Sequence, residues 1–224
     1  MAEIKKILIA NRGEIVQRAI RTIREMGKKS VVVYSAGDKN ASYLKHADEA
    51  VCIGGAKSSE SYLNIPAIIT AAEMTGCDAI FPGYGFLSEN QDFVEICQLH
   101  NIKFIGPSVE VMEKMADKSK AKDEMIRAGV PVVPGSKGAV HSVEEGRRVA
   151  LEIGYPIMAK ASAGGGGRGM RLIENEDKFD QLFTAASSEA LAAFGDGTMY
   201  LERFINNPRH IEVQVVGDSH GNAI

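Results

Sequence analysis

The stretch 5-KKILIANRGEIVQRAIRTIREMGKKSVVVYS-35 decides the fold, because two buried-strand patterns flank one amphipathic helix. Residues 5–10 and 30–35 are short, continuous apolar runs, as in strands that are buried on both faces of a parallel sheet. Gly27 marks the end of the helix between them. Apolar side chains recur along one face of that helix: Val16, Ile20, Ile23 and Met26. This order of elements is typical of a parallel βαβ unit.

The same rhythm continues through the first half of the chain. A helical pattern that begins near 88-SENQDFVEICQLHN-101 has Ser88 and Gln91 at the spacing of a capping box. Three more apolar runs have the character of buried strands: 49–54, 78–83 and 103–107. The pattern predicts an α/β fold, a doubly wound parallel sheet over residues 1–113.

The second half has a different organisation. Residues 114–130 have the pattern of a helical connector, and two prolines after it mark a boundary. A helix capped by Ser142 and Glu145 follows, then two strands on either side of a glycine-rich segment, and then a long amphipathic helix. Strands are also expected near 198–204 and 210–218, the second half-buried because its apolar residues alternate. We expect an α+β region with antiparallel strands.

Composition limits the classes of partner. The chain has 224 residues, 45% hydrophobic and 25% charged, and a net charge of -3 that gives no argument for binding nucleic acid or an anionic membrane. The apolar runs are far shorter than the ~20 residues of a transmembrane helix, and no secretory signal is present. Cys52, Cys77 and Cys97 are interpreted as small buried side chains in a reducing compartment. A cytoplasmic protein is expected.

The segment 160-KASAGGGGRGM-170 has the character of a phosphate-binding loop. Its glycines satisfy G-x-G-x-x-G, but the strand-like "MRLI" follows where a dinucleotide-binding fold would begin a helix. Two interpretations remain open: a mobile lid whose amides bind phosphates, and a plain surface hairpin. Lys160 favours the lid, because a lysine in an apolar strand needs a partner and a triphosphate would supply one. Lys118, in the lysine-rich "ADKSKAK", is weaker evidence.

Taken together, these stretches resemble the biotin carboxylase family of ATP-grasp enzymes. The resemblance runs from residue 7 to the end of the chain, in the family's order. The matching motifs are "ILIANRGEI", "YLNIPAII", "FPGYGFLSEN", "FIGPS", "DKSKAK", "AGVPVVPGS", "GYPIMAKASAGGGGRGMR" and "NNPRHIEVQV". The resemblance implies that residues 131–204 are the lid subdomain of an ATP-grasp domain and that 205–224 begin a second subdomain, which stops early.

The resemblance also assigns nucleotide contacts to nine residues of this chain: Lys118, Lys160, Gly166, Gly167, Glu202, Arg203, Phe204, Ile205 and His210. In it the two lysines bind phosphates and the two glycines close over the triphosphate. The four residues 202–205 form a hinge whose backbone reads adenine, and the histidine lies near the ribose and phosphates. The "ANRGEI" and "GYGFLSEN" loops, at the carboxyl ends of predicted strands, shape the substrate side of the cleft.

The resemblance implies a ligase that uses ATP and bicarbonate to carboxylate biotin on a carrier protein, through carboxyphosphate. It assigns no catalytic residue within this chain and places the magnesium ligands beyond the chain's end; Glu202 and Glu212 are the nearest acidic candidates. Biotin carboxyl carrier protein, carboxyltransferase subunits and a second copy of the chain are the implied partners. On its own, the chain is expected to be inactive and at most a weak ATP binder.

Acetyl-CoA carboxylase is the first choice for the parent complex, because the start of the chain leaves no room for a preceding domain. Three alternatives stay open. They are a pyruvate carboxylase subunit, an ATP-grasp ligase of the carbamoyl-phosphate synthase type, and a nucleotide-binding module without catalysis.

Overall fold

The computed structural model describes residues 3–116, 118–162, 169–218 and 220–224, without the side chains of residues 116–120. The chain divides into two compact units, Met1–Ala121 and Lys122–Ile224. Among the described residues, every helix is too short or too polar to serve as a membrane span.

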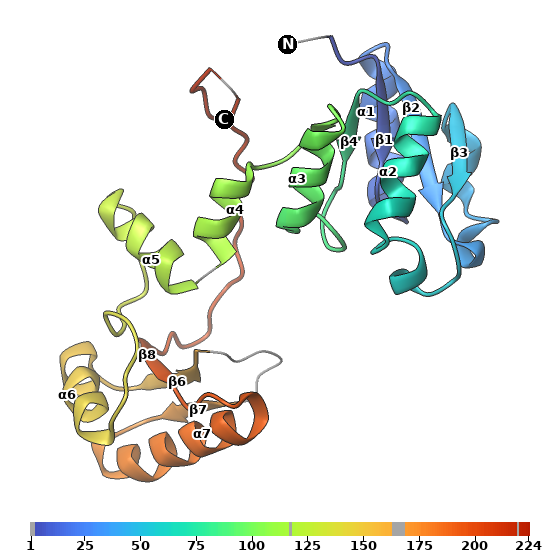
Figure 1. Ribbon diagram of the computed structural model, residues 1–224. Helices are drawn as coiled ribbons and strands as arrows, with labels where there is room; N and C mark the ends of the chain where they lie inside the picture. Colours follow the sequence, from blue (N-terminus) through green and yellow to red (C-terminus); the bar gives the residue numbers. More distant parts are fainter. Residues whose placement is uncertain (1–2, 117, 163–168, 219) are drawn as a thin grey trace. The chain divides into compact units, whose positions relative to one another are not determined.

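The first unit contains a parallel sheet, as predicted. Its strands lie in the order β3-β2-β1-β4-β5 (Figure 1). Leu8, in the central strand, is paired with Val31 on one side and with Ile80 on the other. The direction of winding reverses between β1 and β4, which is the point where such sheets usually bind ligands. The strands are β1 (Lys6–Ile9), β2 (Lys29–Tyr34), β3 (Glu49–Cys52), β4 (Ala79–Phe81) and β5 (Lys103–Phe104).

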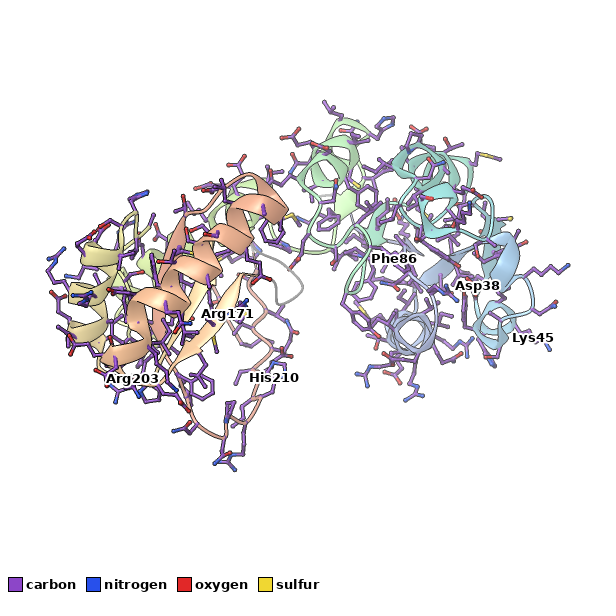
Figure 2. All side chains as sticks on the ribbon, turned by 90° about the horizontal axis from the view of Figure 1, so that it is seen from below. Asp38, Lys45, Phe86, Arg171, Arg203 and His210 are labelled. Atoms are coloured by element: carbon purple, nitrogen blue, oxygen red, sulfur yellow. The ribbon has the colours of Figure 1, made fainter. Side chains whose placement is uncertain are left out.

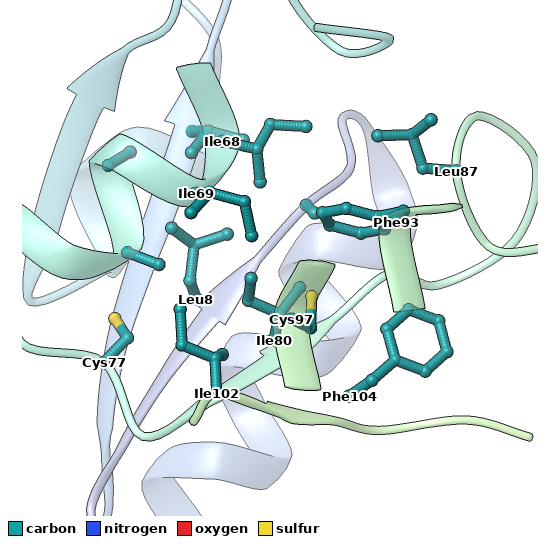
Figure 3. Packing of buried hydrophobic residues seen from close by; sticks show 14 of the residues in the cluster. Leu8, Ile68, Ile69, Cys77, Ile80, Leu87, Phe93, Cys97, Ile102 and Phe104 are labelled. Atoms are coloured by element: carbon teal, nitrogen blue, oxygen red, sulfur yellow. The ribbon is translucent and has the colours of Figure 1, made fainter. Parts of the chain in front are cut away.

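Helices cover both faces of this sheet. On one face, α1 (Glu14–Glu25) packs its apolar side chains against Ile7, Ile9 and Val32. On the other face, α2 (Ile65–Met74), α3 (Gln91–Leu99) and α4 (Val109–Ala116) contribute to a second cluster around Leu8 and Ile80 (Figure 3). Successive strand residues therefore point into different cores, and the continuous apolar runs in the sequence follow from this arrangement.

Three details of the first unit differ from the predictions. Helix α3 is capped by Asn90, whose Oδ1 accepts a hydrogen bond from the Phe93 N–H at 2.8 Å, and not by Ser88. Met26 is 58% exposed, because it lies at the carboxyl end of α1 and not on its buried face. Cys52 is also exposed, because β3 is an edge strand, whereas Cys77 and Cys97 are buried as predicted. Burial raises the pKa of the Cys97 thiol to about 12.

The second unit contains an antiparallel sheet with strand order β7-β6-β8. Its strands are β6 (Ile157–Ala161), β7 (Met170–Ile173) and β8 (Met199–Arg203), and its helices are α5 (Lys118–Arg127, which begins in the first unit), α6 (Val143–Ile153) and α7 (Phe179–Phe194). A strand follows the glycine-rich segment, so the dinucleotide fingerprint is excluded here. Ser142 caps α6 as predicted and accepts a hydrogen bond from the Glu145 N–H at 3.1 Å.

The free edge of β8 is covered by the segment 134–140. The Ser136 N–H donates to the Leu201 carbonyl at 2.8 Å, and the Val140 N–H donates to the Met199 carbonyl at 2.7 Å. The segment makes isolated bridges and no continuous strand. Strand β8 is thus held by hydrogen bonds on both sides, which fixes the positions of its side chains.

The predicted strand at 210–218 is absent from the structure. Ile211, Val213 and Val215 are 73%, 82% and 66% exposed, so the expectation of half-burial is wrong. The alternation shows what this segment could bury, but burial requires a facing layer, and the described residues supply none. Near the end of the chain, Val216 and Ile224 exchange two backbone hydrogen bonds of 2.8 and 3.0 Å.

Gly146 tests the packing of α6 on α7. A Cβ at this position would lie 2.8 Å from Cζ of Phe179, a fully buried ring that stacks on Phe183. Alanine normally stabilises a helix by ~1 kcal/mol relative to glycine, but overpacking costs about 1–3 kcal/mol. We therefore expect Gly146→Ala to lower the free energy of unfolding by about 1 kcal/mol in urea titration. Arg148→Ala, on the exposed face of α6, is the control and should change it by less than ~0.5 kcal/mol; stabilisation by Gly146→Ala would contradict the packing.

Candidate functional site

Strand pairing in the second unit places six side chains on one face of the sheet. Lys160 on β6 is paired with Tyr200 on β8, and Met158 is paired with Glu202. The intervening residues, such as Ile157 and Leu201, are buried against α6 and α7. We call the opposite side the open face; its residues are Met158, Lys160, Met170, Leu172, Tyr200 and Glu202.

Two predicted site residues meet on the open face. The Lys160 ammonium donates a hydrogen bond to Glu202 Oε2 at 2.6 Å. Lys122, from α5, donates to the other oxygen, Glu202 Oε1, at 3.4 Å. The sequence predicted a partner for Lys160, and in the structure this partner is a carboxylate. One carboxylate between two ammonium groups leaves the cluster with a net charge of +1.

The cluster is partly shielded from water. The side chains of Lys160, Glu202 and Lys122 are 28%, 21% and 20% exposed. Burial by itself raises the pKa of Glu202, but the hydrogen bond from Lys160 and the charges of both lysines outweigh it and hold the pKa below its ordinary value of 4.5. Glu202 is therefore ionised at neutral pH.

An aromatic and thioether surface adjoins these charges. The Lys160 Nζ lies 5.8 Å from the centroid of the Tyr200 ring, which is within the range of a cation–π contact. Burial raises the pKa of the Tyr200 hydroxyl, so the ring is neutral at physiological pH. Met158, Met170 and Leu172 complete the apolar part of the open face. An apolar surface beside a positive cluster has the chemistry needed for a nucleotide: one part for the base and another for the phosphates.

The other predicted hinge residues make different contacts. Arg203 donates from Nη1 to the Ile153 carbonyl at 2.7 Å and so satisfies an acceptor at the carboxyl end of α6 (Figure 2). The backbone N–H of Phe204 donates to the Pro156 carbonyl at 2.9 Å, while Ile205 is 50% exposed. Glu202 is thus the hinge residue that contributes a charged side chain to the open face.

His210 lies in the exposed tail (Figure 2). Its Nε2 is 2.9 Å from Glu212 Oε1, and the two side chains are 85% and 80% exposed. The structure does not bring His210 to the open face. Three further predicted contacts lie outside the described residues: Gly166 and Gly167 entirely, and Lys118 for its side chain. They remain predictions.

The two predicted substrate loops of the first unit are tied together by one buried side chain. Asn11 follows β1 and is 2% exposed; its Nδ2 donates to the carbonyls of Pro82 and Tyr84, both at 2.7 Å. The Tyr84 hydroxyl donates to Glu14 Oε1 at 2.7 Å. The loops therefore meet beside the reversal of strand order between β1 and β4, as their positions after the strands predicted.

The described residues of the open face include one carboxylate, that of Glu202, and form no metal-ligand cluster. Within the described part of the chain, no three histidine, cysteine, aspartate or glutamate side chains are placed to hold a metal ion. The two acidic candidates have other partners, since Glu202 binds two lysines and Glu212 binds His210. A hollow of about 460 Å³ lies between the segment 134–140 and α6, and no open-face residue lines it.

Sequence reasoning identified Lys160 and Glu202 but missed their neighbours. Tyr200 alternates with buried residues along β8 as Glu202 does, and Met158 does so along β6 as Lys160 does. Knowing the pairing register between β6 and β8 would therefore have placed Tyr200 and Met158 on the open face. Lys122 had no such signal, because three lysines in a connector are typical of a solvated helix face.

Comparison with known proteins identifies the family. A family model described as "Biotin carboxylase, N-terminal domain" matches residues 3–112, and one described as "Carbamoyl-phosphate synthase L chain, ATP binding domain" matches residues 117–224. The chain is 57% identical over 219 residues to a biotin carboxylase of Nostoc sp., which covers 98% of this chain and 49% of that relative. The chain belongs to the biotin carboxylase family.

Solved structures agree with this membership. A biotin carboxylase from Campylobacter jejuni, in a complex named "beta-gamma-ATP", is 68% identical with a TM-score of 0.85, covering 99% of this chain and 50% of that one. The biotin carboxylase domain dimer of the Hydrogenobacter thermophilus 2-oxoglutarate carboxylase, with MgADP, ADP and bicarbonate, is 49% identical with a TM-score of 0.81, covering 100% and 49%. The chain spans about half the length of the curated relatives it matches.

The match to the first unit separates two alternatives. The match to the ATP-binding domain of carbamoyl-phosphate synthase, taken alone, would fit either a biotin carboxylase or a ligase of the carbamoyl-phosphate synthase type. Residues 3–112 match the amino-terminal domain of biotin carboxylase, and the curated relatives carry that name. The biotin carboxylase prediction is therefore confirmed at the level of the family.

The ion pairs of Glu202 predict a pH dependence. Because its pKa is lower in the folded chain than the ordinary 4.5, the cluster stabilises the fold above that pH, and this contribution is lost as the pH falls below it. Glu202→Gln removes the titrating group. The loss of unfolding free energy between pH 7 and about pH 4, measured in urea, should be smaller in this variant than in the wild type. Glu212→Gln, an exposed carboxylate in the tail, is the control; equal losses in all three proteins would exclude the cluster as a source of stability.

Proposed function

We propose that this chain provides the nucleotide-binding part of a biotin carboxylase, which carboxylates carrier-bound biotin with ATP and bicarbonate. The observation that carries the proposal is the open face, where Lys160 and Glu202 lie beside Tyr200 in a chain of this family. Membership supports the reaction class, and the cluster of net charge +1 supports binding of a polyanion to this face.

In the proposed reaction, bicarbonate attacks the γ-phosphoryl group of ATP, giving carboxyphosphate and ADP. The carboxyl group then passes to a nitrogen of biotin, and phosphate leaves. Phosphoryl transfer requires positioning and charge neutralisation more than covalent help from the protein. Lys160 supplies an ammonium group for the phosphates, and Tyr200 with Met158 supplies an apolar surface for adenine. The glycine-rich segment, with Gly166 and Gly167, is proposed as the lid that excludes water from the unstable anhydride.

ATP, magnesium and bicarbonate are the proposed ligands, supported by the names of the two solved relatives. Magnesium would neutralise phosphate charge when bound. The described residues offer no metal-ligand cluster, so magnesium is not assigned to any of them. The resemblance assigns no catalytic residue to this chain, and none is proposed within it.

The proposed partners of the complete enzyme are a biotin carboxyl carrier protein, carboxyltransferase subunits and a second copy of the chain. The dimer is supported by the Hydrogenobacter thermophilus structure. Acetyl-CoA is the proposed final acceptor, with pyruvate as the alternative. A cytoplasmic location is proposed, supported by three free cysteines. The proposed domain limits are 1–113, 114–130, 131–204 and 205–224.

The proposal predicts that Lys160 contributes to nucleotide affinity through the phosphates. Calorimetric titration of the 224-residue chain should detect MgATP binding, and Lys160→Met should weaken it about tenfold, or ~1.4 kcal/mol. Adenosine lacks phosphates, so its affinity should change much less. Lys137→Met removes one charge from an exposed side chain of the segment 134–140 and is the matched control. Equal MgATP affinity in the wild type and in Lys160→Met would remove Lys160 from the site.

A further inference from the structure

We propose that Lys122 is a positioning residue for the nucleotide: by holding Glu202, it lets the Lys160 ammonium turn to the phosphates. The inference rests on the proposed function and adds to it a residue of the "DKSKAK" motif to which the resemblance assigned no contact. It also gives a reason for the two-to-one ratio of ammonium groups to carboxylate in the cluster of Lys160, Glu202 and Lys122.

The geometry assigns each lysine its own oxygen. Lys160 binds Glu202 Oε2 at 2.6 Å, and Lys122 approaches Oε1 at 3.4 Å. Lys122 is a residue of a lysine-rich helix, yet its side chain is only 20% exposed. It is therefore not part of a solvated helix face, and its ammonium lies in the same shielded environment as the carboxylate.

The absence of a side chain at Gly135 leaves room for the ammonium group of Lys122. A Cβ on Gly135 would lie 2.6 Å from Lys122 Nζ and 2.6 Å from the Leu201 carbonyl oxygen. Gly135 is also bridged to Glu202 across the edge of β8. The missing side chain at position 135 thus leaves the space through which Lys122 reaches Glu202.

In the proposed nucleotide complex, the Lys160 ammonium has two possible anionic partners. A phosphate chain and the Glu202 carboxylate compete for the same ammonium, and a shielded carboxylate that loses its only cation is strongly destabilised. Because Lys122 stays with Glu202, the carboxylate keeps a counter-charge after Lys160 turns away. Without Lys122, binding of the nucleotide must either leave the Glu202 carboxylate without a counter-charge or leave Lys160 paired with that carboxylate.

A double-mutant cycle on the full 224-residue chain tests this, with MgATP affinity measured by calorimetry. Lys122→Met should weaken MgATP binding roughly tenfold when Glu202 is present. In a Glu202→Gln background the same substitution should have little effect, because no carboxylate remains to be held. Lys122→Arg should restore most of the affinity. Lys137→Met loses the same charge away from Glu202 and should behave like the wild type.

The outcomes separate the inference from the function on which it rests. Equal weakening by Lys122→Met in both backgrounds would show a general charge effect and overturn the inference, as would no weakening in either. Adenosine affinity that falls as much as MgATP affinity would also overturn it, since that indicates damage to the fold. A wild-type chain that does not bind MgATP would overturn the proposed function and this inference with it. If the methionine variant does not fold, Lys122→Gln completes the same cycle.

Discussion

The carboxylate of Glu202 joins two lysines that are far apart in the sequence, and the candidate site depends on this contact. Lys160 arrives on β6 and Lys122 on α5, while β8 presents the carboxylate between them. Hydrogen bonds on both edges of β8 hold Glu202 in place, from β6 on one side and from the segment 134–140 on the other. Among the described side chains, removing either lysine leaves the other as the one cation paired with this shielded anion.

The parallel sheet of the first unit was predictable, because strands between two helical layers must be apolar on both faces. Five such runs in the sequence became five strands. Local signals were less reliable. Ser142 caps its helix, but Ser88 does not, because Asn90 lies closer to the first turn and its side-chain Oδ1 accepts the hydrogen bond from the Phe93 N–H. A spacing rule cannot choose between two capping side chains that lie two residues apart.

Features that depend on a facing element could not be read from the sequence. Cys52 has an apolar neighbourhood in the sequence but lies on an edge strand, and residues 210–218 alternate without a strand to pair with. In the site, the sequence marked Lys160 because a lysine in an apolar strand requires a partner. It did not identify that partner as Glu202, nor Lys122 as the third member, since both contacts depend on how α5, β6 and β8 meet in space.

The most direct measurement is a crystal structure of the chain with a non-hydrolysable ATP analogue and magnesium. The account predicts a phosphate oxygen within hydrogen-bonding distance of Lys160 Nζ, with Glu202 retained by Lys122 and adenine against Tyr200. A nucleotide bound elsewhere, with Lys160 still on Glu202 Oε2, would contradict it.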